Sequence, residues 1–244
     1  MELDMTSNTI TSFSDIENHW ETVYQKKAPD TVSWYCPHLE TSLRFIEQVT
    51  QGQNLSIIDV GGGQSTLVDD LLARGYQNVS VLDISKTAIN GTQSRLSEAA
   101  SKVKWFIADI TQATLPENYY DIWHDRAVFH FLTTPEERAA YVRQVNLATK
   151  LGGHVILSTF GLQGPEKCSG LEVVRYDVKS LCEQFGEKFQ LIESVTEIHQ
   201  TPFGTMQQFL YCHFKVSLSP HPLFCTSIIS SMTVFSHVIY SCLI

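Results

Sequence analysis

The sequence predicts an α/β fold, a doubly wound and mostly parallel seven-stranded sheet closed by an antiparallel C-terminal hairpin. Three observations support this prediction. Short apolar runs alternate with segments of helical periodicity, the run Leu55–Val60 leads directly into Gly61-Gly62-Gly63, and a short turn joins the last two strand-like segments. Glycine after a buried strand permits positive φ and removes the Cβ that would keep a ligand off the backbone. Ligands of such folds bind outside the carboxyl ends of the strands.

Composition narrows the class of protein. The 244 residues suffice for one large domain with a full core, and the net charge of −9 without a basic run argues against a nucleic-acid partner. The six cysteines form no C-x-x-C pair and no secretory leader begins the chain, so we expect reduced thiols and a cytoplasmic protein. The nine histidines show no metal-ligand spacing, so no metal is expected.

The chain divides into three parts. Residues 1–12 are polar and unpatterned and predict a flexible arm, residues 13–216 predict the folded domain, and residues 217–244 carry no charge. Residues 223–244 are long enough to cross a bilayer, but Ser and Thr interrupt them and basic flanks are missing. We therefore expect membrane contact only if this stretch is a tail anchor. A segment packed on the domain and a non-native extension are the alternatives, and the extension is favoured.

A helical cap, residues 13–50, precedes the first strand. Ser14 and Asp15 predict the start of a helix over Ile16–Gln25, and Pro37 can open a second helix over His38–Thr50. Large aromatic side chains occupy the first helix and the loop between the two helices: Trp20, Tyr24, Trp34 and Tyr35. They either pack in the core or form a lid over a ligand.

Acidic residues end three predicted strands. Asp59 ends the first strand, Asp83 lies near the end of Asn78–Ile84, and Asp109 near the end of Val103–Ile110. A carboxylate at the second strand can accept hydrogen bonds from both ribose hydroxyls of an adenosine moiety. A carboxylate at the third strand could accept one from an adenine amino group.

Helices are expected between these strands. The first, Ser65–Arg74, takes Ser65 or Gln64 as its cap and stops at Gly75. The second spans Lys86–Ala100.

The second half continues the alternation and ends in the hairpin. A fourth strand, Asp121–Arg126, gathers His124, Asp125 and Arg126 at its end. The expected elements after it are the helix Pro135–Lys150, the strand His154–Phe160, the loop Gly161–Gly170, the helix Val178–Phe185 and the strands Phe189–His199 and Thr205–Val216. The hairpin, and Thr66 where a dinucleotide site has its third glycine, disfavour a nicotinamide oxidoreductase.

Residues 13–216 resemble the class I S-adenosylmethionine-dependent methyltransferases, whose fold is Rossmann-like. Six blocks carry the resemblance by their order and spacing: DVGGG (59–63), VLDIS (81–85), ADI (108–110), DIWHDR (121–126), LGGHVILSTF (151–160) and the closing hairpin. The resemblance implies S-adenosyl-L-methionine as cofactor. Asp59 and the glycines would line its methionine and sugar end, Asp83 its ribose, and Asp109 with Ile110 its adenine. Gly62 stands where the family commonly has Cys, a change that should not harm binding.

The expected site residues fall into three sets. Those expected to bind the cofactor are Asp59, Gly61, Gly62, Gly63, Asp83, Ile84, Asp109, Ile110, Tyr24 and Trp34. The candidate general bases, needed only if the acceptor must lose a proton, are Asp125, His124 and His130. The candidate acceptor contacts are Trp20, Tyr35, Arg126 and Cys168. For His130 a packed core histidine is the favoured alternative, and for Cys168 an ordinary loop cysteine is. For Asp125 the alternative is a surface or capping carboxylate.

The methyl acceptor is less well specified. HWETVY (19–24) and SWY (33–35) look like protein-lysine methyltransferases of elongation factor 1A, but Asp125-Arg126-Ala127 departs from their acid-lysine-glycine block. FHFLT (129–133), Cys168 and RYDVKSLCEQFG (175–186) are more similar to the tellurite and thiopurine type. A small-molecule acceptor is favoured, with a protein lysine and a non-catalytic adenosyl-binding protein as alternatives.

Overall fold

The computed structural model describes residues 13–49 and 52–217, so the predictions for residues 1–12 and for nearly all of 217–244 lie outside the described residues. The helices are α1 Phe13–Lys26, α2 Glu40–Val49, α3 Leu67–Ala73, α4 Lys86–Leu96, α5 Pro135–Ala148 and α6 Val178–Phe185. The strands are β1 Ser56–Val60, β2 Asn78–Asp83, β3 Val103–Ile107, β4 Tyr120–Arg126, β5 Thr149–Phe160, β6 Lys167–Cys168, β7 Leu171–Glu172, β8 Phe189–Gln200 and β9 Met206–Val216.

The predicted fold class is confirmed. Seven strands form one sheet in the order β3-β2-β1-β4-β5-β9-β8, and β6 pairs with β7 in a separate two-stranded sheet. The pairs β3-β2, β2-β1, β1-β4 and β4-β5 are parallel, whereas β9 runs antiparallel to both β5 and β8. The order reverses at β1 and β4, so the loops after these two strands flank the crevice where such sheets bind ligands.

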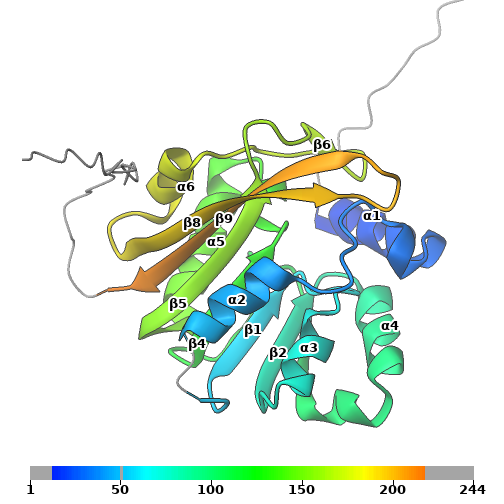
Figure 1. Ribbon diagram of the computed structural model, residues 1–244, viewed down its shortest axis with the longest axis horizontal. Helices are drawn as coiled ribbons and strands as arrows, with labels where there is room; N and C mark the ends of the chain where they lie inside the picture. Colours follow the sequence, from blue (N-terminus) through cyan, green and yellow to red (C-terminus); the bar gives the residue numbers. More distant parts are fainter. Residues whose placement is uncertain (1–12, 50–51, 218–244) are drawn as a thin grey trace, which may run out of the picture.

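Helices α2, α3 and α4 cover one face of the sheet and α5 and α6 cover the other (Figure 1), and each face has its own buried core. On one face, which we call the α2–α4 face, Ile57, Ile122 and Ile156 pack with residues of α2, α3 and α4. On the other, the α5–α6 face, Ile58 and Trp123 pack with residues of α5 and α6. Successive side chains of a strand point to opposite faces, so adjacent residues of one strand serve different cores.

The junction of α5 and β5 differs from the prediction. The helix expected to reach Lys150 ends at Ala148, and the strand begins at Thr149 rather than His154. Thr149 pairs with Tyr120 at the start of β4, and this long-range pairing outweighs helix propagation into a β-branched residue. Similarly, α4 ends at Leu96, and a 3₁₀ turn over Ser97–Lys102 takes the place of its expected last turn.

Smaller differences lie near the cap and the C-terminal loops. Helix α1 begins at Phe13, so Ser14 and Asp15 are inside it rather than before it. Helix α2 begins at Glu40, two residues later than expected. The expected loop over residues 161–170 contains β6. Within the described part of the chain, no helix has both the length and the apolar character needed to cross a bilayer.

Candidate active site

A cavity that is partly open to solvent lies at the carboxyl ends of β1 and β4 on the α2–α4 face, with about 540 Å³ of empty space that includes open solvent. Residues of the helical cap between Tyr24 and Leu39 form part of its wall. Its lining residues are Tyr24, Pro29, Val32, Trp34, Tyr35, Cys36, Leu39, Asp59, Gly61, Gly62, Gln64, Ser65, Thr66, His124 and Arg126. The structure thus brings together several residues that the sequence predicted for donor and acceptor binding.

The glycine turn after β1 forms one wall of this cavity. Gly61 and Gly63 have φ of 69° and 43°, which L residues other than glycine rarely adopt. A Cβ on Gly62 would lie 2.7 Å from Asp59 Oδ2, and one on Gly63 would lie 2.6 Å from the hydroxyl of Tyr24. The turn therefore needs glycine both for its backbone angles and for the close approach of Asp59 and Tyr24.

A chain of buried polar contacts leads from Asp59 to the other end of the cavity. Asp59 Oδ1 lies 2.7 Å from His124 Nδ1, and His124 Nε2 lies 2.9 Å from the hydroxyl of Ser42 in α2. Ser42 also hydrogen-bonds the phenol of Tyr211, which accepts from Arg126 Nε at 3.1 Å. With His124 neutral and protonated on Nδ1, every hydrogen bond in this chain has one donor and one acceptor.

His124 is placed at the cavity as predicted, yet this chain occupies both of its ring nitrogens. Its ring is only 1% exposed, and neither nitrogen is left to take a proton from an acceptor. The imidazole instead orients Asp59 beneath the glycine turn.

Arg126 lines the cavity at the end of this chain. Its Nη1 donates to the carbonyl of Trp34 at 2.9 Å, and its guanidinium lies 4.6 Å from the ring centroid of Phe209. Trp34 and Tyr35 also line the cavity, whereas Trp20 packs edge-on against Trp34 and Phe131 and is absent from the lining. Trp20 therefore packs against Trp34 without contacting the cavity itself.

Asp83 lies just outside the cavity lining, beneath α1. Its Oδ1 accepts from the backbone N–H of Ser85 at 2.8 Å, and Gly63 donates to it as well. Burial raises the pKa of Asp83 to about 7, and the nearby charge of Asp59 adds to the shift. Ile84, half-buried, follows it and is also outside the lining.

The structure does not bring the predicted adenine contacts to the cavity. Asp109 Oδ1 accepts from both the N–H and the hydroxyl of Thr111, at 2.7 and 2.8 Å, which is a local turn. Ile110 is buried in the core of the α5–α6 face. Neither residue belongs to the lining.

Asp125 was predicted to face the methyl group, and the structure contradicts this. It is fully buried on the α5–α6 face, where it accepts from the Tyr141 hydroxyl at 2.6 Å and from the N–H groups of Val128 and Phe129 at 2.8 and 3.1 Å. Burial raises its pKa to about 6. Asp125 therefore fixes the turn after β4, as the alternative of a capping carboxylate had it.

His130 and Cys168 are also outside the lining. The fully buried Nδ1 of His130 accepts from the N–H of Phe160 at 3.1 Å, and burial lowers the pKa of His130 to about 3. Burial raises the pKa of the Cys168 thiol in β6 to about 11. His130 is thus a core histidine, and Cys168 is a thiol rather than a thiolate at neutral pH.

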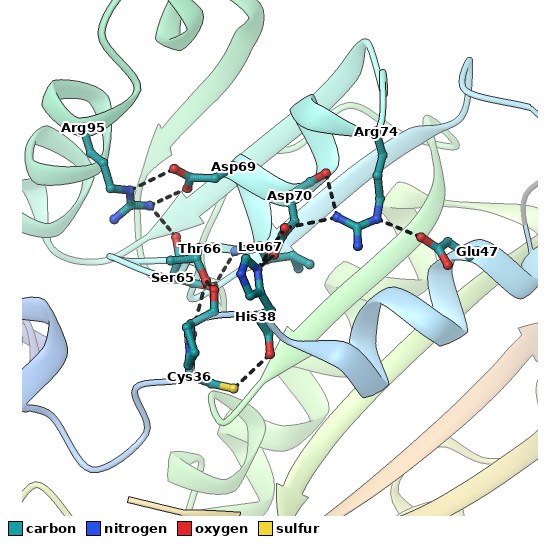
Figure 2. A network of polar contacts seen from close by, with 11 residues as sticks. Cys36, His38, Glu47, Ser65, Thr66, Leu67, Asp69, Asp70, Arg74 and Arg95 are labelled. Atoms are coloured by element: carbon teal, nitrogen blue, oxygen red, sulfur yellow. Dashed lines mark hydrogen bonds and ion pairs between the residues drawn. The ribbon is translucent and has the colours of Figure 1, made fainter. Parts of the chain in front are cut away.

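A polar network fixes the cap segment against the start of α3 (Figure 2). Thr66 Oγ1 donates to the carbonyls of Cys36 and Pro37 at 3.2 and 2.9 Å, and His38 Nδ1 lies 3.0 Å from Asp70 Oδ2. The hydrogen bond with Asp70 raises the pKa of His38. Because Cys36 and Thr66 both line the cavity, this network holds its two walls together.

The sequence missed several residues of the site. Ser42, Tyr211 and the segment Gln64–Thr66 were not singled out as ligand contacts. For Tyr211 the alternating pattern of its strand was a usable signal, since it places this phenol on a buried face. Ser42 reaches His124 only through tertiary packing, and no local pattern marks it. In the described residues, no group of His, Cys, Asp and Glu is arranged to hold a metal ion.

Comparison with known proteins identifies the kind of domain. Residues 57–153 match the family described as methyltransferase domain. The mouse eEF1A lysine and N-terminal methyltransferase is 24% identical over 139 residues, covering 57% of this chain and 20% of that protein. Human EEF1A lysine methyltransferase 2 is 21% identical over 191 residues, covering 72% of this chain and 75% of that protein. The chain thus spans about a fifth of the length of the mouse relative.

Solved structures share the fold at low identity. A protein from a study of the conversion of a disulfide bond into a thioacetal group during echinomycin biosynthesis superposes with a TM-score of 0.68 at 17% identity, covering 82% of this chain and 93% of that one. A Burkholderia thailandensis 1,6-didemethyltoxoflavin-N1-methyltransferase, solved with S-adenosylhomocysteine, has a TM-score of 0.62 at 13% identity, covering 89% and 98%. The comparisons agree with the predicted family and with its cofactor, S-adenosyl-L-methionine.

Proposed function

Because this chain carries a class I S-adenosylmethionine-dependent methyltransferase domain, we propose that it is an enzyme that transfers a methyl group from S-adenosyl-L-methionine to a small-molecule nucleophile. The observation that carries the proposal is the cavity over the Gly61–Gly63 turn, with Asp59 in its wall and Asp83 buried beside it. Acids at the tips of β1 and β2 beside a glycine turn suit an adenosyl ligand.

The residues present fit the donor at two points. The glycine turn exposes backbone with no Cβ, which leaves room for the methionine arm. Asp83 is a buried carboxylate without a cationic partner among the described residues, so the ribose hydroxyls would supply the hydrogen bonds it lacks. Tyr24 belongs to the cavity lining, whereas Asp83 does not. The ribose would therefore reach Asp83 once the Tyr24 hydroxyl moves away from Gly63.

The donor supplies a sulfonium methyl whose bond to sulfur breaks as the bond to the acceptor forms, leaving a neutral thioether. The protein has to align the acceptor with this methyl and exclude water. Trp34 and Tyr35 close the cavity from the cap side. Since His124 has no free ring nitrogen, the arrangement suits a nucleophile that reaches the site already deprotonated.

A protein lysine is the second candidate acceptor. The relatives named as eEF1A lysine methyltransferases favour it, although they share less than a quarter of their aligned residues with this chain. The cationic Arg126 in the cavity wall argues against a lysine ammonium. A non-catalytic adenosyl-binding protein would bind the donor equally well. Only a measurement of turnover distinguishes it from an enzyme.

Binding of S-adenosylhomocysteine tests the donor site. We expect this ligand, but not NAD, to raise the melting temperature of the wild-type protein. Calorimetry with Asp83→Ala should show a dissociation constant about a hundredfold weaker, because two ribose hydrogen bonds to a charged group are lost. Glu98→Ala, an exposed acid on the 3₁₀ turn, is the matched control and should bind normally.

Transfer of labelled methyl groups to fractionated metabolites and proteins then tests the acceptor. Label in the metabolite fraction supports a small-molecule acceptor. Label found only in the protein fraction would indicate a protein lysine as the acceptor instead. Equal binding by Asp83→Ala and wild type would remove Asp83 from the donor site.

A further inference from the structure

The guanidinium of Arg126 lacks a counter-charge. Nε donates to Tyr211 and Nη1 to the Trp34 carbonyl, whereas the buried Nη2 has no hydrogen-bond partner in the described residues. No carboxylate of the described residues lies within ion-pair distance of Arg126. By contrast, four other arginines pair with carboxylates at 2.7 to 3.1 Å: Arg44, Arg74, Arg95 and Arg175.

This difference matters because Arg126 is also the arginine in the cavity wall. Removing a guanidinium from water without an anion is unfavourable unless a ligand supplies the missing charge. The hydrogen bonds to Tyr211 and Trp34 hold it in one orientation, so less conformational entropy is lost on binding. Arg126 is therefore preorganised for an anion.

A further unpaired donor lies beside it. Ser158 of β5 is the register partner of Arg126 across the parallel ladder, so the two side chains share the α2–α4 face. Its hydroxyl is fully buried and has no partner among the described residues. The unpaired atoms of Arg126 and Ser158 can both donate a hydrogen bond, as binding of an oxyanion requires.

We propose that Arg126, with its register partner Ser158 beside it, binds an oxyanion of the methyl acceptor, so that the acceptor is an anionic small molecule bearing a carboxylate or phosphate. This rests on the proposed function and narrows its substrate class. A lysine ammonium is disfavoured by repulsion from Arg126. Because the donor also has a carboxylate, the experiment must separate these two sources.

Anion binding to protein saturated with S-adenosylhomocysteine tests the proposal. Sodium phosphate or sodium acetate, titrated at constant ionic strength, should raise the wild-type melting temperature saturably. Arg126→Met should need about tenfold more anion for the same shift, since it loses a charge-assisted hydrogen bond. Arg143→Met, an exposed arginine of α5, is the matched control and should behave as wild type.

Ser158→Ala provides a second test of the anion site in case Arg126→Met does not fold. Its hydroxyl has no partner to lose, so the fold should stand while the anion response weakens. The proposal is overturned if wild type gives no saturable response, or if Arg126→Met and wild type respond alike. It is equally overturned if Arg126→Met binds S-adenosylhomocysteine tenfold more weakly, because the guanidinium then holds the donor's carboxylate. If wild type binds anions but not S-adenosylhomocysteine, the proposed function fails and the anion site stands.

Discussion

The two faces of the sheet use buried polar residues in different ways at the carboxyl end of β4. On the α2–α4 face, His124 and Arg126 border a cavity, and Arg126 keeps an unpaired donor. On the α5–α6 face, Asp125 lies between them in sequence and has three hydrogen-bond donors within 3.1 Å. Of these three side chains, only Arg126 keeps an unpaired hydrogen-bond donor.

This difference separates stability from function along a single strand. A polar group whose hydrogen bonds are satisfied within the protein holds the fold together, and one left partly unsatisfied beside a cavity awaits a ligand. Substitutions on the α5–α6 face should therefore destabilise the protein without weakening ligand binding. Substituting Arg126, which lines the cavity on the α2–α4 face and keeps an unpaired donor, should instead weaken ligand binding more than stability.

The largest expected effect belongs to Asp125→Ala. Removing the carboxylate leaves the Tyr141 hydroxyl and the N–H groups of Val128 and Phe129 unpaired, so the free energy of unfolding should fall by about 3–5 kcal/mol. Urea unfolding at neutral pH measures this loss, and the folded fraction should bind S-adenosylhomocysteine normally. Asp125→Asn, which keeps one acceptor oxygen, should lie between. A stable Asp125→Ala protein that binds the donor but transfers no methyl would restore Asp125 to the reacting centre.

A smaller effect is expected in the pH dependence of stability at Asp83. Its pKa is about 7 in the folded protein against 3.8 ordinarily, so its contribution to stability is fully present below about pH 4 and is lost as the pH rises through 7. The difference in unfolding free energy between wild type and Asp83→Asn should therefore shift against wild type by about 2–4 kcal/mol between pH 4 and 8.

Taking this difference cancels the titration of the histidines that the two proteins share. Saturating S-adenosylhomocysteine should reduce the slope for wild type, because ribose hydroxyls stabilise the ionised carboxylate. A flat difference across this range would show that Asp83 ionises at its ordinary pKa and carries no strain from burial.

The smallest effect is expected for Cys168→Ala. The sulfur packs in the core of the α2–α4 face and is protonated at neutral pH, so its loss should cost about 1 kcal/mol of stability. Affinity for S-adenosylhomocysteine and the rate of methyl transfer should stay within about twofold of wild type. A tenfold slower transfer at unchanged stability would make Cys168 an acceptor contact, as the sequence allowed.

The glycine turn and the acids at the ends of β1 and β2 were predictable from the sequence because their signals are local. An apolar run, an acid and three glycines specify the end of β1, and Asp83 follows the same logic at β2. The fold class, a mostly parallel sheet closed by an antiparallel hairpin, followed from the alternation of elements and the short turn before the last strand. Asp125 was assigned to the wrong face of the sheet because β4 is buried on both faces. Ile122 and Trp123 therefore give no apolar–polar alternation from which the face of each side chain could be predicted.

The acceptor end depends on contacts between distant residues. Arg126 is held by Trp34 and Tyr211, which lie 92 and 85 positions away, and no local pattern encodes either contact. The unpaired state of Nη2 can be recognised only when all its neighbours are known. Asp109 lies outside the cavity lining, and its strand ends at Ile107, three residues earlier than the predicted end at Ile110.

A crystal structure of the protein with S-adenosylhomocysteine tests the central claim most directly. The account predicts the methionine arm over Gly61–Gly63, the ribose hydroxyls within hydrogen-bond distance of Asp83, and the sulfur facing the cavity wall that contains Arg126. A ligand bound elsewhere, or one whose ribose does not reach Asp83, would contradict the account.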